Sequence, residues 1–210
     1  EADLSKMAAI GLPFWMAGAY GTSERVAAAV AAGAEGVQVG TVFAMSSDSG
    51  LPDEARALML ERLRNDGLVV RNDPRASPTG FPFKVISVDG TVSQESVYDA
   101  RPRLCDLSYL RQAYQREDGT VGYRCAAEPV HMWEKKGGTL EDTVGRKCLC
   151  NGLVATIGMA QHRKDGYVED RIMTLGEDLE GPRELLARHP QGWSAVEALA
   201  YLQEGLGTSP

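Results

Sequence analysis

The first third of the chain alternates short apolar runs with a helix-forming segment. Residues 14–17 are continuously apolar over the length of a strand, which is typical of a parallel strand covered on both faces. Residues 23–33 then predict a helix, with Thr22 or Ser23 as its N-cap and Gly33 just after its end. The run at 36–43 is rich in β-branched residues and predicts a second strand.

A second helix is predicted over residues 51–67, with Pro52 in its first turn and Gly67 just past its end. Strands and helices that alternate over short connections form right-handed parallel crossover units, as in a (β/α)8 barrel or an open doubly wound sheet. Residues 1–70 therefore predict an α/β fold.

The pattern changes after residue 70. Residues 71–85 carry three prolines and two aromatic residues and predict an ordered loop, and residues 83–93 resemble a hairpin around Asp89 and Gly90. We assign residues 71–150 to a loop and hairpin insertion that holds all four cysteines. Residues 151–210 form a third, helical segment, with helices predicted over 151–164 and then over 181–188 with 194–206.

Composition and charge narrow the class of protein. The chain has 210 residues, of which 43% are hydrophobic and 24% charged, and its net charge is −7. This acidic balance argues against nucleic acid or an anionic membrane as partner. No apolar run approaches the roughly 18–20 residues that span a bilayer, and no signal peptide opens the sequence. We therefore expect a globular cytoplasmic protein.

Small residues follow both predicted strands. Gly18 and Ala19 come after the first strand, and Gly40 and Thr41 come after the second. Ligands of α/β proteins lie beyond the carboxyl ends of strands, where backbone N–H groups near a helix N-terminus attract anions. The two turns together predict a phosphate site, to which the Thr41 hydroxyl adds a donor. Two ordinary tight turns remain the alternative.

The stretch from Leu12 to Leu51 resembles the FMN-dependent nitronate monooxygenase (2-nitropropane dioxygenase-like) family, because Ala-Gly-Ala-Tyr-Gly, Ala-Ala-Gly-Ala-Glu-Gly and Val-Gln-Val-Gly-Thr-Val-Phe follow in the family's order. The resemblance implies strands 7 and 8 of a (β/α)8 TIM-type barrel, followed by a loop-rich, mostly helical extension. It also implies that the FMN phosphate meets the backbone at Gly18, Ala19, Gln38, Val39, Gly40 and Thr41.

The resemblance further implies an oxidoreductase that oxidises a small alkyl nitronate or related carbon acid with O2. Two alternatives stay open. One is a flavin-dependent enoyl-thioester (acyl-carrier-protein) reductase, which acts on an acyl thioester with a nicotinamide cofactor, and the other is a non-catalytic subunit or scaffold that retains the phosphate turn. The family's catalytic histidine lies in a Gly-rich segment. None of His131, His162 or His189 has that context, so we assign no catalytic residue.

Two departures from the family pattern matter. Ala19 stands where the family has a second glycine, and a left-handed backbone there carries a penalty of about 1 kcal/mol or more. Strands 1 to 6 of the implied barrel have no counterpart in this sequence. Because two strands cannot close a barrel, we expect a second polypeptide or a precursor segment to complete it.

The four cysteines, Cys105, Cys125, Cys148 and Cys150, include one Cys-x-Cys pair. A tetrahedral zinc site is one interpretation, with Glu128 or His131 as substitute ligands, and disulfides are another. Buried, unliganded thiols are the interpretation we favour, because free cysteine is commonly buried in reduced proteins. We therefore assign no metal ligand.

Overall fold

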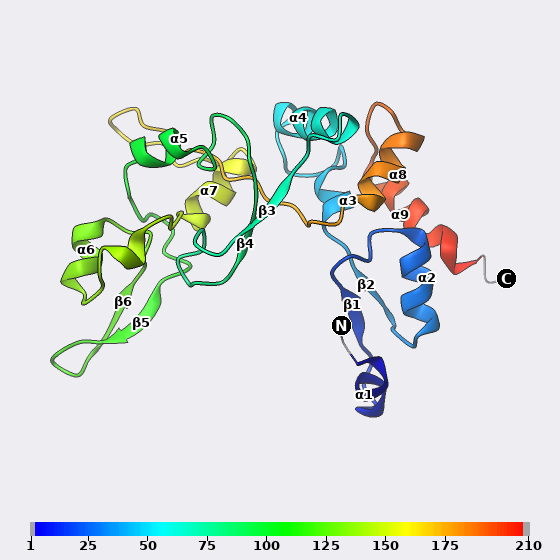
Figure 1. Cartoon of the computed structure of the whole chain (residues 1–210), viewed down its shortest axis with the longest axis horizontal. Helices are drawn as coiled ribbons and strands as arrows, with labels where there is room; N and C mark the ends of the chain where they lie inside the picture. Colours follow the sequence, from blue (N-terminus) through cyan, green and yellow to red (C-terminus); the bar gives the residue numbers. More distant parts are fainter. Residues whose placement is uncertain (1–2, 208–210) are drawn as a thin grey trace. The chain divides into compact units, whose positions relative to one another are not determined.

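The computed structural model describes residues 3–207 and divides the chain into two compact units (Figure 1). Unit 1 consists of the residues up to Leu68 together with those from Leu175 onward, and unit 2 is Val69–Thr174. The helical segment predicted over residues 151–210 therefore contributes to both units. No helix among residues 3–207 is long and apolar enough to cross a membrane.

Unit 1 is built on one strand–helix–strand crossover. Its elements are α1 (Leu4–Ala9), β1 (Trp15–Ala17), α2 (Ser23–Ala31), β2 (Gly36–Gln38), α3 (Thr41–Ala44), α4 (Asp53–Arg64), α8 (Glu180–Arg188), α9 (Ala195–Gln203) and the 3-10 turn η2 (Glu204–Leu206). Strands β1 and β2 pair in parallel, with Trp15 opposite Gly36 and Ala17 opposite Gln38. The predicted α/β organisation of this region is confirmed.

The boundaries of α2 follow from local chemistry. The Thr22 hydroxyl accepts a hydrogen bond from the Arg25 N–H at 3.3 Å, which satisfies one of the free amides at the helix start. Gly33 lies two residues beyond the helix with φ of +93°, the left-handed conformation that ends many helices. Both ends of this helix agree with the sequence-based prediction.

Three details of the prediction were wrong. The second strand stops at Gln38 instead of reaching residue 43, because the chain turns at Gly40 into the short helix α3. Trp15 in β1 is 58% exposed, so this strand is not covered on both faces within the described residues 3–207. Helix α4 ends at Arg64, and Asp66, with φ of +53°, takes the left-handed position expected for Gly67.

The C-terminal helices complete the core of unit 1. Trp193 is only 2% exposed, and its indole N–H donates to the Val42 carbonyl at 2.7 Å. The Ser47 N–H donates to the Trp193 carbonyl at 2.8 Å. Helix α9 starts with a capping box between Ser194 and Glu197. These contacts tie the last part of the chain to the segment after β2.

Unit 2 is rich in loops. Its elements are β3 (Val70–Asp73), β4 (Phe83–Ile86), α5 (Glu95–Ala100), β5 (Gln112–Gln115), β6 (Val121–Arg124), α6 (Val130–Lys135), the 3-10 turn η1 (Glu141–Thr143) and α7 (Leu149–Thr156). The strands form two antiparallel pairs, β3 with β4 and β5 with β6. Leu149 and Ile172 pack against β4 residue Val85 in its main apolar cluster.

The hairpin predicted around Asp89 and Gly90 is wrong. Strand β4 pairs with β3, and after the turn at Gly90 the Val92 N–H donates to the Arg171 carbonyl at 2.9 Å. The tight hairpin of unit 2 is instead β5–β6, with Gly119 in its turn at φ of +79°. The helix predicted over residues 151–164 is also shorter, since α7 ends at Thr156.

Candidate functional site

The two predicted phosphate-binding turns leave neighbouring strands at the same end of the sheet. Ala17 pairs with Gln38 in the parallel register, so the turn that starts at Gly18 and the turn that starts at Val39 are adjacent. This juxtaposition brings together the segments of all six predicted residues. The carboxyl edge of a parallel sheet is where α/β proteins bind their ligands.

The backbone of the first turn has an uncommon conformation. Gly18 and Ala19 are both left-handed, with φ of +83° and +60°. Glycine adopts this conformation without penalty, whereas the Cβ of Ala19 makes it unfavourable by roughly 1–2 kcal/mol. Strained residues of this kind cluster at binding sites, where the surrounding structure enforces them.

Open space lies in front of both turns. A Cβ built on Gly18 or on Gly40 would meet no other atom within 4 Å. A bulky group can therefore approach the backbone closely at these two positions. This is the property that a phosphate held by amide N–H groups requires.

Thr41 is held in place by a residue from the distant C-terminal part of unit 1. Its hydroxyl oxygen accepts a hydrogen bond from the Gly176 N–H at 3.0 Å, so its own hydrogen is available for a ligand. A Cβ on Gly176 would lie 2.7 Å from the Thr41 hydroxyl oxygen. Sequence reasoning did not identify Gly176, because nothing in the local pattern links it to Thr41.

Arg25 fixes the strained turn from the side of α2. Its guanidinium donates to the Ala19 carbonyl at 2.9 Å and forms ion pairs with Asp178 and with Glu180, the latter at 2.6 Å. These contacts connect the first turn to the start of α8. Sequence reasoning did not identify Arg25 either, because a charged side chain by itself does not indicate a contact with the Ala19 carbonyl.

A cavity of about 860 Å³, open to solvent, lies beside β2. Gln38, Val39 and Gly40 line it, whereas Gly18, Ala19 and Thr41 do not. Its apolar walls come from α2, α3, α9 and η2, through the side chains of Val26, Val30, Phe43, Leu199, Leu202 and Leu206. Such a wall suits a flat apolar group or another apolar segment of protein.

The histidines do not assemble a catalytic centre at this edge. His131 is exposed and His162 forms an isolated bridge to Val168, both within unit 2. His189 follows α8 and lies 3.2 Å from a carboxylate oxygen of Glu197. We assign no catalytic residue from the structure.

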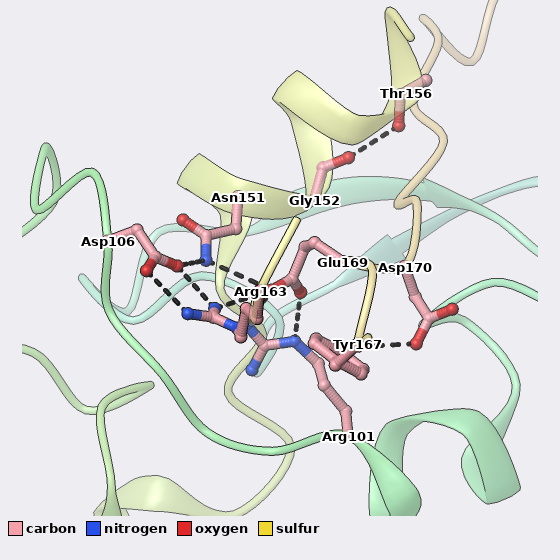
Figure 2. Close-up of polar contacts among 9 residues, drawn as sticks. All are labelled: Arg101, Asp106, Asn151, Gly152, Thr156, Arg163, Tyr167, Glu169 and Asp170. Atoms are coloured by element: carbon pink, nitrogen blue, oxygen red, sulfur yellow. Dashed lines mark hydrogen bonds and ion pairs between the residues drawn. The ribbon is translucent and has the colours of Figure 1, made fainter. Parts of the chain in front are cut away.

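A second constellation, in unit 2, was not anticipated. Figure 2 shows Arg101 and Glu169 paired through two hydrogen bonds, with side chains only 5% and 0% exposed. Asn151 of α7 donates to Asp106 at 2.6 Å and to Glu169 at 3.2 Å. Arg163 donates to both carboxylate oxygens of Asp106, at 2.8 and 2.6 Å, and this hydrogen bonding lowers the pKa of Asp106. The network joins three separate chain segments around the buried Arg101–Glu169 pair, and its Asp106–Arg163 end is partly exposed.

The four cysteines are all free thiols in unit 2. No group of three or more His, Cys, Asp or Glu side chains within residues 3–207 is arranged to hold a single metal ion. The interpretation as a zinc site therefore has no support from the structure.

The part of the chain that contains the two turns is similar to a known protein family. Residues 4–79 match the family model described as nitronate monooxygenase. Neither the curated proteins nor the solved structures contain a match to the chain. The family match covers β1, α2, β2, α3 and α4, the elements that carry the candidate site. Residues 4–79 are therefore similar to part of this family, whose members are generally flavin-dependent oxidoreductases.

Proposed function

We propose that this chain carries the FMN-phosphate half of a flavin-dependent oxidoreductase that oxidises a small alkyl nitronate or a related carbon acid with O2. The observation that supports the proposal best is the parallel pairing of β1 with β2, which sets the left-handed Gly18–Ala19 turn beside Gly40. The family match over residues 4–79 supports flavin as the ligand.

The residues of the two turns fit a phosphate. Gly18 and Gly40 leave space in front of the backbone, and Thr41 retains a hydroxyl hydrogen to donate. Ala19 already holds the left-handed conformation, so binding needs no rearrangement there. When bound, the isoalloxazine ring of FMN supplies the redox chemistry. The residues of this chain bind the phosphate and thereby fix where the ring can lie.

The proposal includes a second component that completes the sheet. Within residues 3–207, β1 and β2 pair only with each other, which leaves a free edge on each side. Unpaired strand edges and the apolar cavity beside β2 are both unfavourable in water. We propose that further parallel strands cover them, supplied by another polypeptide or by a longer form of this chain. Native mass compared with intact mass tests this, and a lone 22.6 kDa monomer that binds FMN tightly would contradict it.

A titration with FMN and with riboflavin, which lacks the phosphate, tests the role of the turns. The purified assembly should quench FMN fluorescence and bind riboflavin more weakly. Gly18→Ala forces a Cβ onto a left-handed residue that faces the proposed phosphate. Gly11→Ala is a matched control, because Gly11 is also left-handed, with φ of +72°, and also has no atom near a built Cβ.

We expect Gly18→Ala to weaken FMN binding and Gly11→Ala to leave it unchanged. Equal affinities for FMN and riboflavin, or equal effects of the two substitutions, would remove the basis for the phosphate site. Activity assays then distinguish the two reactions. Oxygen uptake with alkyl nitronates supports the proposal, whereas NADH consumption with an enoyl thioester favours the reductase. An assembly that takes up no FMN would be a scaffold.

A further inference from the structure

One short segment in the C-terminal part of unit 1 contacts both turns of the proposed phosphate site. The segment is residues 176–181, which lead into α8 and begin it. At one end, the Gly176 N–H donates to the Thr41 hydroxyl oxygen in the second turn. At the other end, a Cβ built on Gly181 would lie only 1.8 Å from the carbonyl oxygen of Gly21, just after the first turn. The backbone of α8 therefore lies directly against the chain at this edge of the sheet.

A third contact of the same segment runs through Arg25 of α2. Asp178 and Glu180 both form ion pairs with the Arg25 guanidinium. The Asp178 carboxylate also accepts a hydrogen bond from the Glu180 N–H at 3.1 Å, which ties it to the start of α8. The same guanidinium donates to the Ala19 carbonyl at 2.9 Å. Because two carboxylates hold the guanidinium, its position against the first turn is fixed.

Ala19 is the residue of the turns that most needs such a partner. Its backbone is left-handed, with φ of +60°. The Cβ of alanine reduces the population of this conformation by roughly tenfold or more. Residues in such a conformation keep it only where surrounding contacts enforce it. The hydrogen bond from Arg25 to the Ala19 carbonyl is a contact of that kind.

We propose that Arg25 is a positioning residue of the phosphate site, which holds the Gly18–Ala19 turn in the conformation that binds the FMN phosphate. The inference rests on the proposed function and adds that residues 176–181 control the affinity for FMN through Arg25. Arg25 acts through the Ala19 carbonyl, since two carboxylates already engage its guanidinium. Affinity falls in proportion to the fraction of protein in the binding conformation, so loss of this contact weakens FMN binding.

Titration of the purified assembly with FMN and with riboflavin tests the inference. Arg25→Met keeps the apolar stem of the side chain and removes the donor to the Ala19 carbonyl. We expect FMN binding to weaken on the order of tenfold, because the turn then populates the left-handed conformation less. The affinity for riboflavin should change little, because riboflavin has no phosphate. An equal loss for both ligands would overturn the inference, because it would show a general effect on folding.

A second substitution distinguishes conformation from charge. Arg25→Met also leaves Asp178 and Glu180 without their counter-charge, and these carboxylates would repel a phosphate. Glycine adopts the left-handed conformation without penalty, so adding Ala19→Gly should restore most of the FMN affinity that Arg25→Met removes. Charge repulsion would not be relieved by this change. Failure of Ala19→Gly to restore binding would therefore refute the positioning role.

Arg183→Met is the matched control. Arg183 lies on α8, its side chain is 44% exposed against 40% for Arg25, and it also pairs with a carboxylate, that of Asp66. This variant should leave both affinities unchanged, and a loss as large as that in Arg25→Met would overturn the inference. Equal affinities of the unmodified assembly for FMN and riboflavin would refute the proposed phosphate site and this inference with it. A preference for FMN that persists undiminished in Arg25→Met would refute the inference alone.

Discussion

The buried pair of Arg101 and Glu169 provides a quantitative test of how unit 2 is held together. Glu169→Gln keeps the size of the side chain and removes its charge. The Arg101 side chain is only 5% exposed, so the substitution leaves a cation buried without its counter-charge. Breaking a buried ion pair in this way typically costs about 3–5 kcal/mol. We expect about 3 kcal/mol here, because glutamine still accepts a hydrogen bond.

Such a change lowers the folding equilibrium constant of unit 2 by roughly two orders of magnitude, since about 1.4 kcal/mol corresponds to a factor of ten. Hydrogen exchange followed by mass spectrometry measures it locally. Peptides from Val69–Thr174 should lose protection, whereas peptides from the first 68 residues should not.

Arg183→Ala is the control for an exposed ion pair. Arg183 and Asp66 lie 2.7 Å apart, with side chains 44% and 80% exposed. Exposed pairs contribute about 0–1 kcal/mol, so this substitution should change protection little. Equal effects of Glu169→Gln and Arg183→Ala would show that burial does not determine the contribution of the Arg101–Glu169 pair.

Three further predictions follow from single contacts. Ala19→Gly removes an unfavourable left-handed Cβ, and because glycine loses more backbone freedom on folding, the net gain for unit 1 should be up to about 1 kcal/mol in thermal unfolding; a loss of stability would contradict the observed backbone. Gly176→Ala places a Cβ 2.7 Å from the Thr41 hydroxyl oxygen and should weaken FMN binding in the titration, and unchanged affinity would exclude Thr41 from the site. Since the pKa of Asp106 is lowered by Arg163, its contribution to stability is present above the unfolded pKa of about 3.9 and is lost as pH falls through the folded value. Arg163→Met should reduce this loss of stability, as measured by urea unfolding below pH ~4, although the hydrogen bond from Asn151 to Asp106 remains, and a loss as large as in the unmodified chain would exclude the Arg163 contact as a cause.

The features that the sequence predicted best depend on neighbouring residues. The Thr22 cap and Gly33 fix the ends of α2, and two short strands around that helix are sufficient to predict a crossover unit. Gly18, Ala19, Gly40 and Thr41 became candidates because they come after the predicted strands, whereas Gln38 and Val39 became candidates only through the family resemblance. In each case the residues that form the pattern lie within a few positions of the helix, strand or turn that they predict.

The features that were missed depend on residues far apart in the chain. Gly176 reaches Thr41, and Glu169 reaches Arg101, through contacts that no local pattern encodes. The Asp89–Gly90 pair resembles a hairpin turn, but Val92 instead finds its partner at Arg171. The β5–β6 hairpin was overlooked because its strands are mostly exposed and lack an apolar face.

The discontinuity of unit 1 has a consequence for biosynthesis. Val69–Thr174 is a continuous stretch, so it can reach its native packing while the ribosome is still extending the chain. The part of unit 1 before Leu68 completes its core later, because Trp193 and the helices around it are synthesised after unit 2. During this interval the apolar wall of α2 faces the solvent, and a nascent chain halted at that stage is the form most exposed to chaperones and to aggregation.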